Sequence, residues 1–197
     1  MTWQLAEKMT DWCIRQGLLA QEDYPMYVYC IDLLLGKLFF YAALLLVAGW
    51  FDILAVTFCY YLGFLPFRYT AGGYHAKTNL SCVVLTWAVY GGSMLLVTWA
   101  EQFSAMWTAG SALFLVLLAT VAAWRYAPID HVNKPVLPAR KKQMRRQCLA
   151  FQTVFMITIL LFLWQQYHIW AFSIALGNGI AALFLLVAYY QKEGTNL

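Results

Sequence analysis

The chain of 197 residues is 63% hydrophobic and only 11% charged, with a mean hydropathy of +0.63. Soluble domains carry about 25% charged residues, so this composition excludes an ordinary water-soluble fold and indicates an integral membrane protein. The net charge of +4 comes from cations in short segments beside apolar runs. That distribution fits the positive-inside bias of membrane proteins and argues against nucleic-acid binding.

Five cysteines are spread along the chain without CxxC spacing: Cys13, Cys30, Cys59, Cys82 and Cys148. Their odd number and their positions in or beside apolar runs argue against a disulfide framework or a zinc site, and no cofactor is expected. The first 25 residues are rich in charge and contain no apolar core, so no cleavable signal peptide is expected.

The first predicted element is an amphipathic helix over residues 3–16, within a cytoplasmic segment that covers residues 1–26. Four residues recur at helical spacing, while charged residues occupy the other faces: Trp3, Ala6, Met9 and Cys13. This pattern is typical of a helix that lies at a membrane surface. A partly ordered cytoplasmic tail is the alternative.

Six apolar runs follow, and most are long enough to cross a bilayer of about 30 Å as helices. The predicted spans cover residues 33–50, 53–67, 82–100, 105–124, 148–164 and 169–190. The second is short, with Pro66 marking its end, and Gly91–Gly92 in the third permits a close helix contact or a bend. The sequence therefore predicts a single-domain, all-α polytopic membrane protein with about six transmembrane helices.

The distribution of lysine and arginine predicts how these spans are oriented in the membrane. All 13 fall in segments that the six spans place on one side, whereas the opposite loops carry only Asp52, Glu101 and His168. Because positively charged loops stay in the cytoplasm, both termini and the polar segments 68–81 and 125–147 are expected on the cytoplasmic face.

The polar stretch between the second and third spans is the strongest candidate for chemistry. Residues 68–82 read RYTAGGYHAKTNLSC and hold one histidine, one cysteine, two adjacent glycines and two cations. A thiol is mostly protonated near neutral pH, and an imidazole with a pKa of about 6.5 can accept its proton. His75 and Cys82 are therefore the candidate base and nucleophile of a cysteine enzyme.

An unbroken helix would keep these two side chains apart. Seven residues at about 1.5 Å each separate them by about 10 Å along the axis, which is beyond hydrogen-bond reach. The backbone must therefore bend, and Gly72 and Gly73 supply the torsional freedom just upstream. Cys82 at the start of the next helix would feel the positive end of its dipole, which favours the thiolate.

Other polar residues of the stretch have structural as well as functional explanations. Arg68 and Lys77 either anchor a span at the lipid head groups or raise the positive potential around the thiolate. Thr78 or Asn79 either caps the following helix or, with Ser81, orients the imidazole or donates to an oxyanion.

A second polar segment, residues 126–146, holds three prolines and six cations. The charges either keep this loop in the cytoplasm beside anionic lipid or form a docking surface for an acidic peptide, and both can hold at once.

These motifs resemble the accessory gene regulator B (AgrB) family of bacterial quorum-sensing endopeptidases. The resemblance covers almost the whole chain in length and in the number and order of spans. It is carried by YAP at residues 126–128, by KP at 134–135 before a basic cluster, and by six residues of the polar stretch: Arg68, Gly72, Gly73, His75, Ala76 and Cys82.

The resemblance implies a cysteine peptidase of the bacterial cytoplasmic membrane, active on the cytoplasmic side, that matures a propeptide, AgrD, into a cyclic autoinducing peptide. Cys82 would attack the C-terminal processing site after His75 takes its proton, and an internal Cys or Ser of the substrate would close the ring. Arg68, Gly72 and Gly73 would support the site. The resemblance also implies a homodimer and a set of cations that hold the acidic tail of the propeptide: Lys134, Arg140, Lys141, Lys142, Arg145 and Arg146.

Two other classes of function stay open on the residues alone. One is a small transporter or channel in which the polar stretch is a re-entrant or gating loop and Cys82 is incidental. The other is a noncatalytic membrane adaptor that recruits acidic peptides through its basic loop.

Overall fold

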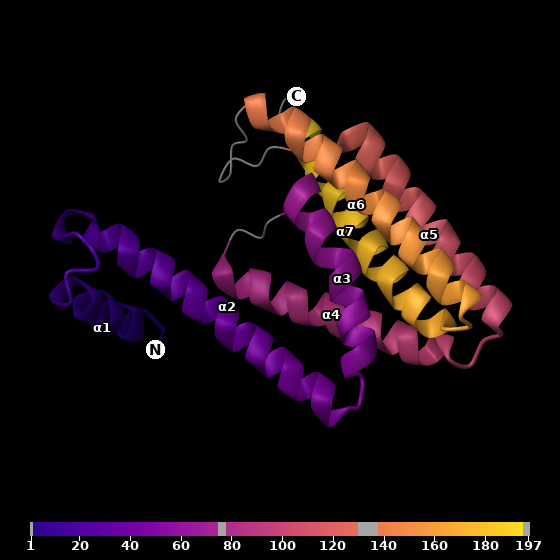
Figure 1. The fold of residues 1–197 in the computed structure, drawn as a ribbon, viewed down its shortest axis with the longest axis horizontal. Helices are drawn as coiled ribbons and strands as arrows, with labels where there is room; N and C mark the ends of the chain where they lie inside the picture. The colour runs from indigo at the N-terminus through magenta and orange to yellow at the C-terminus, as the bar shows by residue number, and fades with distance from the viewer. Residues whose placement is uncertain (1, 75–77, 130–137, 195–197) are drawn as a thin grey trace. The chain divides into compact units, whose positions relative to one another are not determined.

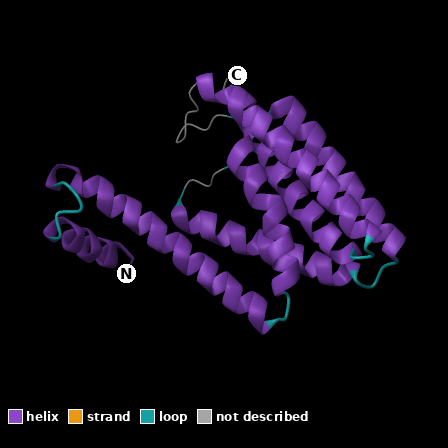
Figure 2. Ribbon diagram, viewed as in Figure 1, coloured by secondary structure: helices purple, strands orange, loops and turns teal. Residues whose placement is uncertain are grey.

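The computed structural model describes residues 2–74, 78–129 and 138–194, and their regular structure is helical throughout. Besides one 3₁₀ turn, Gln21–Asp23, the elements are α1 (Thr2–Arg15), α2 (Tyr24–Trp50), α3 (Leu54–Ala71), α4 (Asn79–Ala100), α5 (Ala105–Tyr126), α6 (Pro138–Trp164) and α7 (His168–Gly194) (Figures 1 and 2). The predicted all-α fold is confirmed. The chain divides into two compact units, Met1–Leu54 and Ala55–Leu197.

In the first unit, α1 packs on α2 through small side chains. Ala6 and Thr10 are buried together with Val28 and Leu35 of α2, and the Thr10 hydroxyl donates to the Ala6 carbonyl at 2.8 Å. The predicted amphipathic helix is therefore present. Its large apolar residues, such as Met9, stay exposed on another face of the helix.

The helix of the first span begins at Tyr24, nine residues before the span expected from Leu33. Pro25 lies in its first turn. Proline is well tolerated in the first helical turn, where its missing N–H has no partner to lose. The helix ends at Trp50, and Asp52 follows in the left-handed conformation, where the turn was expected.

Among the described residues, five helices are long and apolar enough to cross a membrane: α2, α4, α5, α6 and α7. They confirm a polytopic membrane protein. The remaining predicted span, the second, corresponds to α3, which is not in this group. Its 18 residues span about 27 Å at 1.5 Å per residue, close to the thickness of a hydrocarbon core, but its last turn carries Arg68 and Thr70.

In the second unit, α7 is the central helix. Its most apolar window is 61% buried, compared with 22% to 28% for α4, α5 and α6. Figure 1 shows α5, α6 and α7 side by side, with α3 along α7. The core between them is rich in alanine, including Ala112 and Ala119 of α5 and Ala175 and Ala182 of α7. Small side chains allow membrane helices to approach closely.

The closest backbone approach joins α3 to α7 through two glycines. A Cβ on Gly63 would overlap the Ile174 carbonyl oxygen, and a Cβ on Gly177 would overlap the Tyr60 carbonyl oxygen. At Gly91–Gly92, where the sequence permits a close helix contact or a bend, no described atom beyond their own helix lies within 4 Å of a Cβ built at either position, so the described residues make no close contact there.

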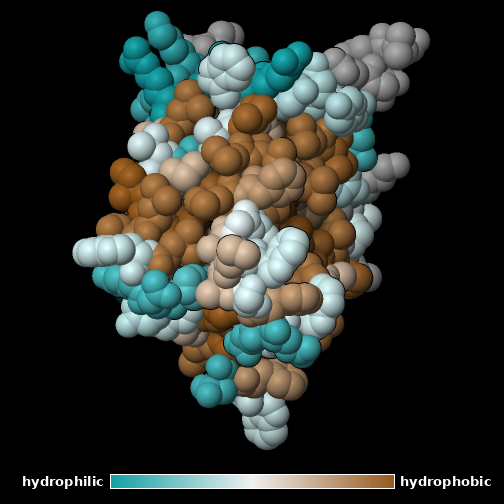
Figure 3. All heavy atoms as spheres, turned by 90° about the vertical axis from the view of Figure 1, so that its right-hand side faces the viewer, coloured by the Kyte–Doolittle hydropathy of each residue, from teal (hydrophilic) through white to brown (hydrophobic). Residues whose placement is uncertain are grey.

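The outer surface of the molecule suits lipid. Figure 3 shows one face whose middle is mostly hydrophobic, with hydrophilic side chains gathered toward its upper and lower ends. Leu95 and Met106, for example, are 72% and 80% exposed. Apolar surface on this scale is unfavourable in water and favourable in a bilayer.

Candidate functional site

The polar stretch opens as helix rather than loop. The segment expected to be a loop from Arg68 to Ser81 is helical at both ends, because α3 continues to Ala71 and α4 begins at Asn79. Pro66 lies inside α3 instead of ending it. The connection between the two helices is therefore shorter than expected, and Arg68 is held on a helix.

Two glycines end α3 in conformations that other residues rarely adopt. Gly72 has φ +80° and Gly73 has φ +135°. A Cβ on Gly72 would lie 2.7 Å from the Ile129 carbonyl oxygen, and a Cβ on Gly73 would overlap the Arg68 guanidinium. The predicted bend upstream of His75 is present, and both its torsions and its crowding require glycine.

Arg68 ties this bend together. Its guanidinium donates to the Gly72 carbonyl at 3.1 Å and to the Tyr74 carbonyl, and its Cζ lies 5.5 Å from the centroid of the Phe184 ring. A planar guanidinium can make both hydrogen bonds while resting on an aromatic face. Beyond the two roles expected of it, anchoring a span or raising the potential around the thiolate, the Arg68 side chain clamps the loop backbone.

Backbone hydrogen bonds attach the same bend to two other segments. The Tyr74 N–H donates to the Phe184 carbonyl of α7 at 3.0 Å, and the Ile129 N–H donates to the Ala71 carbonyl at 3.0 Å. Together with the bond from Arg68, they hold Tyr74 at both its N–H and its carbonyl. The residue immediately before His75 is therefore fixed.

Cys82 lies in the first turn of α4. Thr78 caps this helix: its hydroxyl accepts from the Ser81 N–H at 3.2 Å, and the Ser81 hydroxyl accepts from the Thr78 N–H at 3.2 Å. This capping box confirms Thr78 as the N-cap and gives Ser81 a structural role. The Cys82 side chain is exposed, near the positive end of the helix dipole.

Arg68 and Cys82 interact electrostatically. Burial lowers the pKa of the Arg68 guanidinium, which follows the predicted second span, and the charge on the Cys82 sulfur raises it.

Three of the predicted functional residues, His75, Lys77 and Lys134, lie outside the described residues. The distance between the imidazole and the Cys82 sulfur therefore stays a prediction.

The basic cluster is helical, although a loop was expected over residues 125–147. It occupies the first turns of α6, which begins at Pro138 because proline again fits the start of a helix. Arg140, Lys142 and Arg146 are exposed there. The Arg145 guanidinium instead donates to the Trp124 carbonyl at 2.7 Å and satisfies an orphan acceptor at the end of α5.

Two residues of the site were missed by the sequence analysis. Phe184 lies in the middle of an apolar span, where no local signal distinguishes it from lipid-facing neighbours. Ile129 directly follows the YAP motif at residues 126–128, which was quoted only as part of a resemblance. That motif was the local sequence signal for Ile129, because it marks the end of α5, where the chain turns to hydrogen-bond with Ala71.

The chain is similar to known proteins over most of its length. A sequence model of the accessory gene regulator B family matches residues 6–186. The accessory gene regulator protein B of Staphylococcus lugdunensis is 26% identical over 190 residues, which cover 96% of each chain. No solved structure matches this chain. The chain belongs to the accessory gene regulator B family.

Proposed function

We propose that this protein is a membrane-embedded cysteine endopeptidase that cleaves the C-terminal tail from an AgrD-like propeptide and promotes its cyclisation. The observation that carries the proposal is the position of Cys82. Its exposed thiol lies in the first turn of a capped helix and interacts with the charge of Arg68. These are the surroundings that generate reactive thiolates.

The first half of the reaction cleaves the propeptide. His75 takes the proton of the Cys82 thiol, and the sulfur attacks the carbonyl carbon of the scissile peptide bond. The carbon–nitrogen bond then breaks, the proton passes from the imidazolium to the leaving amine, and the tail departs as a free peptide. The rest of the propeptide stays attached to Cys82 as a thioester.

The second half closes the ring. An internal Cys or Ser of the substrate gives its proton to His75 and attacks the thioester carbonyl, and the Cys82 sulfur leaves and recovers the proton. When the attacking group is a thiol, one thioester replaces another with little change in free energy. Exclusion of water and departure of the tail would therefore decide the yield.

The bend before His75 supports the assignment of the base. Helix alone would separate residues 75 and 82 by about 10 Å along its axis. The helix α3 instead ends at Ala71, α4 begins only at Asn79, and Tyr74 between them is held by Arg68 and by Phe184. In this proposal Arg68, Gly72 and Gly73 position His75 and do not touch the substrate.

The start of α6 would bind the acidic tail. Arg140, Lys142 and Arg146 are exposed there, and the free N–H groups of the first turn add positive potential. Arg145 is already used by the Trp124 carbonyl. Lys134 and Lys141 complete the proposed tail-binding set, which would face the cytoplasm of a bacterial cell with the protein acting as a homodimer.

Co-expression with the cognate propeptide tests the proposal. Mass spectrometry of the released tail should show none from Cys82→Ala or His75→Ala. Cys30→Ala is a matched control, because Cys30 is also an exposed thiol, on α2, and it should release the tail normally. Normal release from both active-site variants would overturn the proposal.

A further inference from the structure

We propose that Phe184 is a positioning residue of the proposed active site, because its ring holds the Arg68 guanidinium in the place from which it clamps the chain before His75. The inference rests on the proposed function and adds to it a residue of α7 that lies within an apolar membrane span. The Phe184 side chain would act through Arg68 and would not touch the substrate.

Phe184 meets the glycine bend with its backbone and with its side chain. Its carbonyl accepts the Tyr74 N–H at 3.0 Å, and a Cβ on Gly73 would lie 3.2 Å from the same carbonyl oxygen. Its ring lies beneath the Arg68 guanidinium, whose Cζ atom is 5.5 Å from the ring centroid. This residue of α7 therefore contacts the bend at Gly73, Tyr74 and Arg68.

Only the ring contact depends on which side chain stands at position 184. The backbone carbonyl is the same for every residue, so a leucine there would accept the Tyr74 N–H equally well. Leucine would also suit contact with lipid or with an apolar core. The aromatic ring differs because its face carries negative electrostatic potential, which attracts a cation. The choice of phenylalanine at this position therefore bears on Arg68.

Arg68 is a long side chain that must be fixed in one conformation to clamp the bend. Its guanidinium donates to the Gly72 and Tyr74 carbonyls together, and ordering an arginine costs much rotamer freedom. The side chain is partly buried, and attraction between a cation and an aromatic face is stronger where water is excluded. The Phe184 ring therefore favours the conformation that makes both hydrogen bonds.

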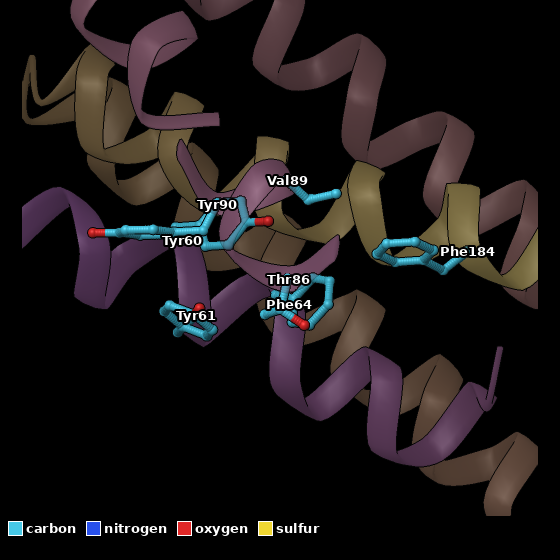
Figure 4. A pocket seen from close by; sticks show the side chains of 7 residues that line it. All are labelled: Tyr60, Tyr61, Phe64, Thr86, Val89, Tyr90 and Phe184. Atoms are coloured by element: carbon cyan, nitrogen blue, oxygen red, sulfur yellow. The ribbon is translucent and has the colours of Figure 1, made fainter. Parts of the chain in front are cut away.

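A second ring keeps Phe184 in place. Phe64 packs edge-to-face against Phe184 with ring centroids 6.2 Å apart, and it lies one turn before Arg68 on the same face of α3. Figure 4 shows the two rings on their separate helices. The cavity that both rings line has a volume of only about 20 Å³, which is room for about one water molecule. Little free space therefore remains beside the Phe184 ring on that side.

Arg68 links the ring to both members of the proposed catalytic pair. It holds the carbonyl of Tyr74, the residue immediately before His75, and it interacts electrostatically with Cys82. Loss of the ring should therefore slow the chemical step. Substrate binding should change little, because neither Phe184 nor Arg68 touches the propeptide in the proposed function.

Fluorinated phenylalanines test the ring contact at nearly constant shape. Analogues that carry one, two or three ring fluorine atoms are incorporated at position 184, and release of the tail from the cognate propeptide is measured by mass spectrometry. Each fluorine withdraws charge from the ring face while the size of the side chain hardly changes. The value of kcat should fall stepwise, by about tenfold over the series, with KM unchanged. The same analogues at Phe172, a partly buried residue of α7 packed against the apolar core, are the matched control and should not alter kcat.

Two ordinary substitutions accompany the series. Phe184→Leu keeps an apolar side chain and removes the ring, so it should lower kcat by about tenfold. Phe184→Tyr keeps the ring and should retain activity. Membrane yield reports the folding of each variant, and the fluorinated series decides if Phe184→Leu does not reach the membrane.

Equal kcat across the fluorinated series, with Cys82→Ala inactive, would overturn the role of the ring and leave the proposed function intact. A rise in KM at constant kcat would also overturn it, because Phe184 would then contact the substrate. Tail release from Cys82→Ala at the normal rate would instead reject the proposed function, on which the inference rests.

Discussion

Arg68 has several bonding partners near the bend. It donates to two carbonyl groups, rests on the Phe184 ring and interacts with the Cys82 charge. Lysine keeps the charge but cannot form the planar fork. A lysine at this position therefore separates the electrostatic role of Arg68 from its clamping role.

We predict that Arg68→Lys lowers kcat for tail release by about tenfold or more, since hydrogen bonds from charged groups each contribute about 1.5–3 kcal/mol. KM should change little, because Arg68 positions His75 and does not touch the substrate in the proposed function. Arg125→Lys, on the exposed surface of α5, is the control. A rise in KM with unchanged kcat would contradict the clamping role.

A substitution at one of the two glycines of the bend gives a second prediction. Gly73→Ala should abolish tail release, because its Cβ would overlap the Arg68 guanidinium at a φ of +135°. Gly91→Ala adds the same methyl group where no described atom beyond its helix lies within 4 Å, and it should retain full activity. Tail release measured by mass spectrometry, with membrane yield as the folding control, compares the two. Equal activity of both variants would rule out the bend as a requirement.

At the scale of single residues, sequence analysis predicted the features that are determined by residues nearby in the sequence. The glycine bend, the Thr78 cap and the place of Cys82 at a helix start all follow from local sequence. The contacts of Phe184 and Ile129 do not, because they join segments that are far apart along the chain. The approach of His75 to Cys82 stays a prediction.

Among the elements, the crossing of α3 and α7 determines where the site lies. Gly63 and Gly177 face one another's helix backbones, and this crossing lets Phe184 reach the bend at the end of α3. Thr57 and Tyr90 join α3 to α4 through their hydroxyl groups at 2.7 Å. The helix α4, which carries Cys82, and the helix α3, which carries Arg68, are therefore packed on each other.

We predict that Gly63→Ala and Gly177→Ala each destabilise the protein by about 1–3 kcal/mol, because the added methyl group must push two helices apart. Gly110→Ala on α5 adds a methyl group that meets no described atom within 4 Å outside its helix. It should be neutral or stabilising by up to about 1 kcal/mol, since alanine is the better helix former. Unfolding in detergent provides the measurement, and equal stability of all three variants would contradict the crossing.

Sequence analysis predicted that each helix exists, but it placed several ends wrongly. Apolar runs define the part of a helix that lies in lipid, whereas its true ends depend on caps and on proline positions. Pro25 and Pro138 begin helices, and Pro66 lies within one. The three prolines therefore have different structural roles, which composition alone does not separate.

Across the whole molecule, the membrane topology depends on α3. Within the described part of the chain, five other helices are long and apolar enough to span a bilayer, and α3 is close to the required length. If α3 crosses, the N-terminal segment lies on the same face as the polar segments 68–81 and 125–147, as the distribution of cations predicts.

Labelling of single cysteines with a membrane-impermeant thiol reagent tests the crossing. We predict that Asp52→Cys and Thr78→Cys, placed before and after α3 in a chain without other cysteines, react from opposite sides of the membrane. Arg146→Cys should react from the same side as Thr78→Cys. Labelling of residues 52 and 78 from one side would contradict a spanning α3.

The most direct measurement of the central claim is the mass of the protein after incubation with a propeptide whose internal Cys or Ser is replaced by alanine. Ring closure is then blocked, so the account predicts an adduct equal to the propeptide without its tail, bound to Cys82 and removed by hydroxylamine. The adduct should be absent from Cys82→Ala and present in Cys30→Ala. Release of the tail without any adduct on Cys82, or an adduct on another residue, would contradict it.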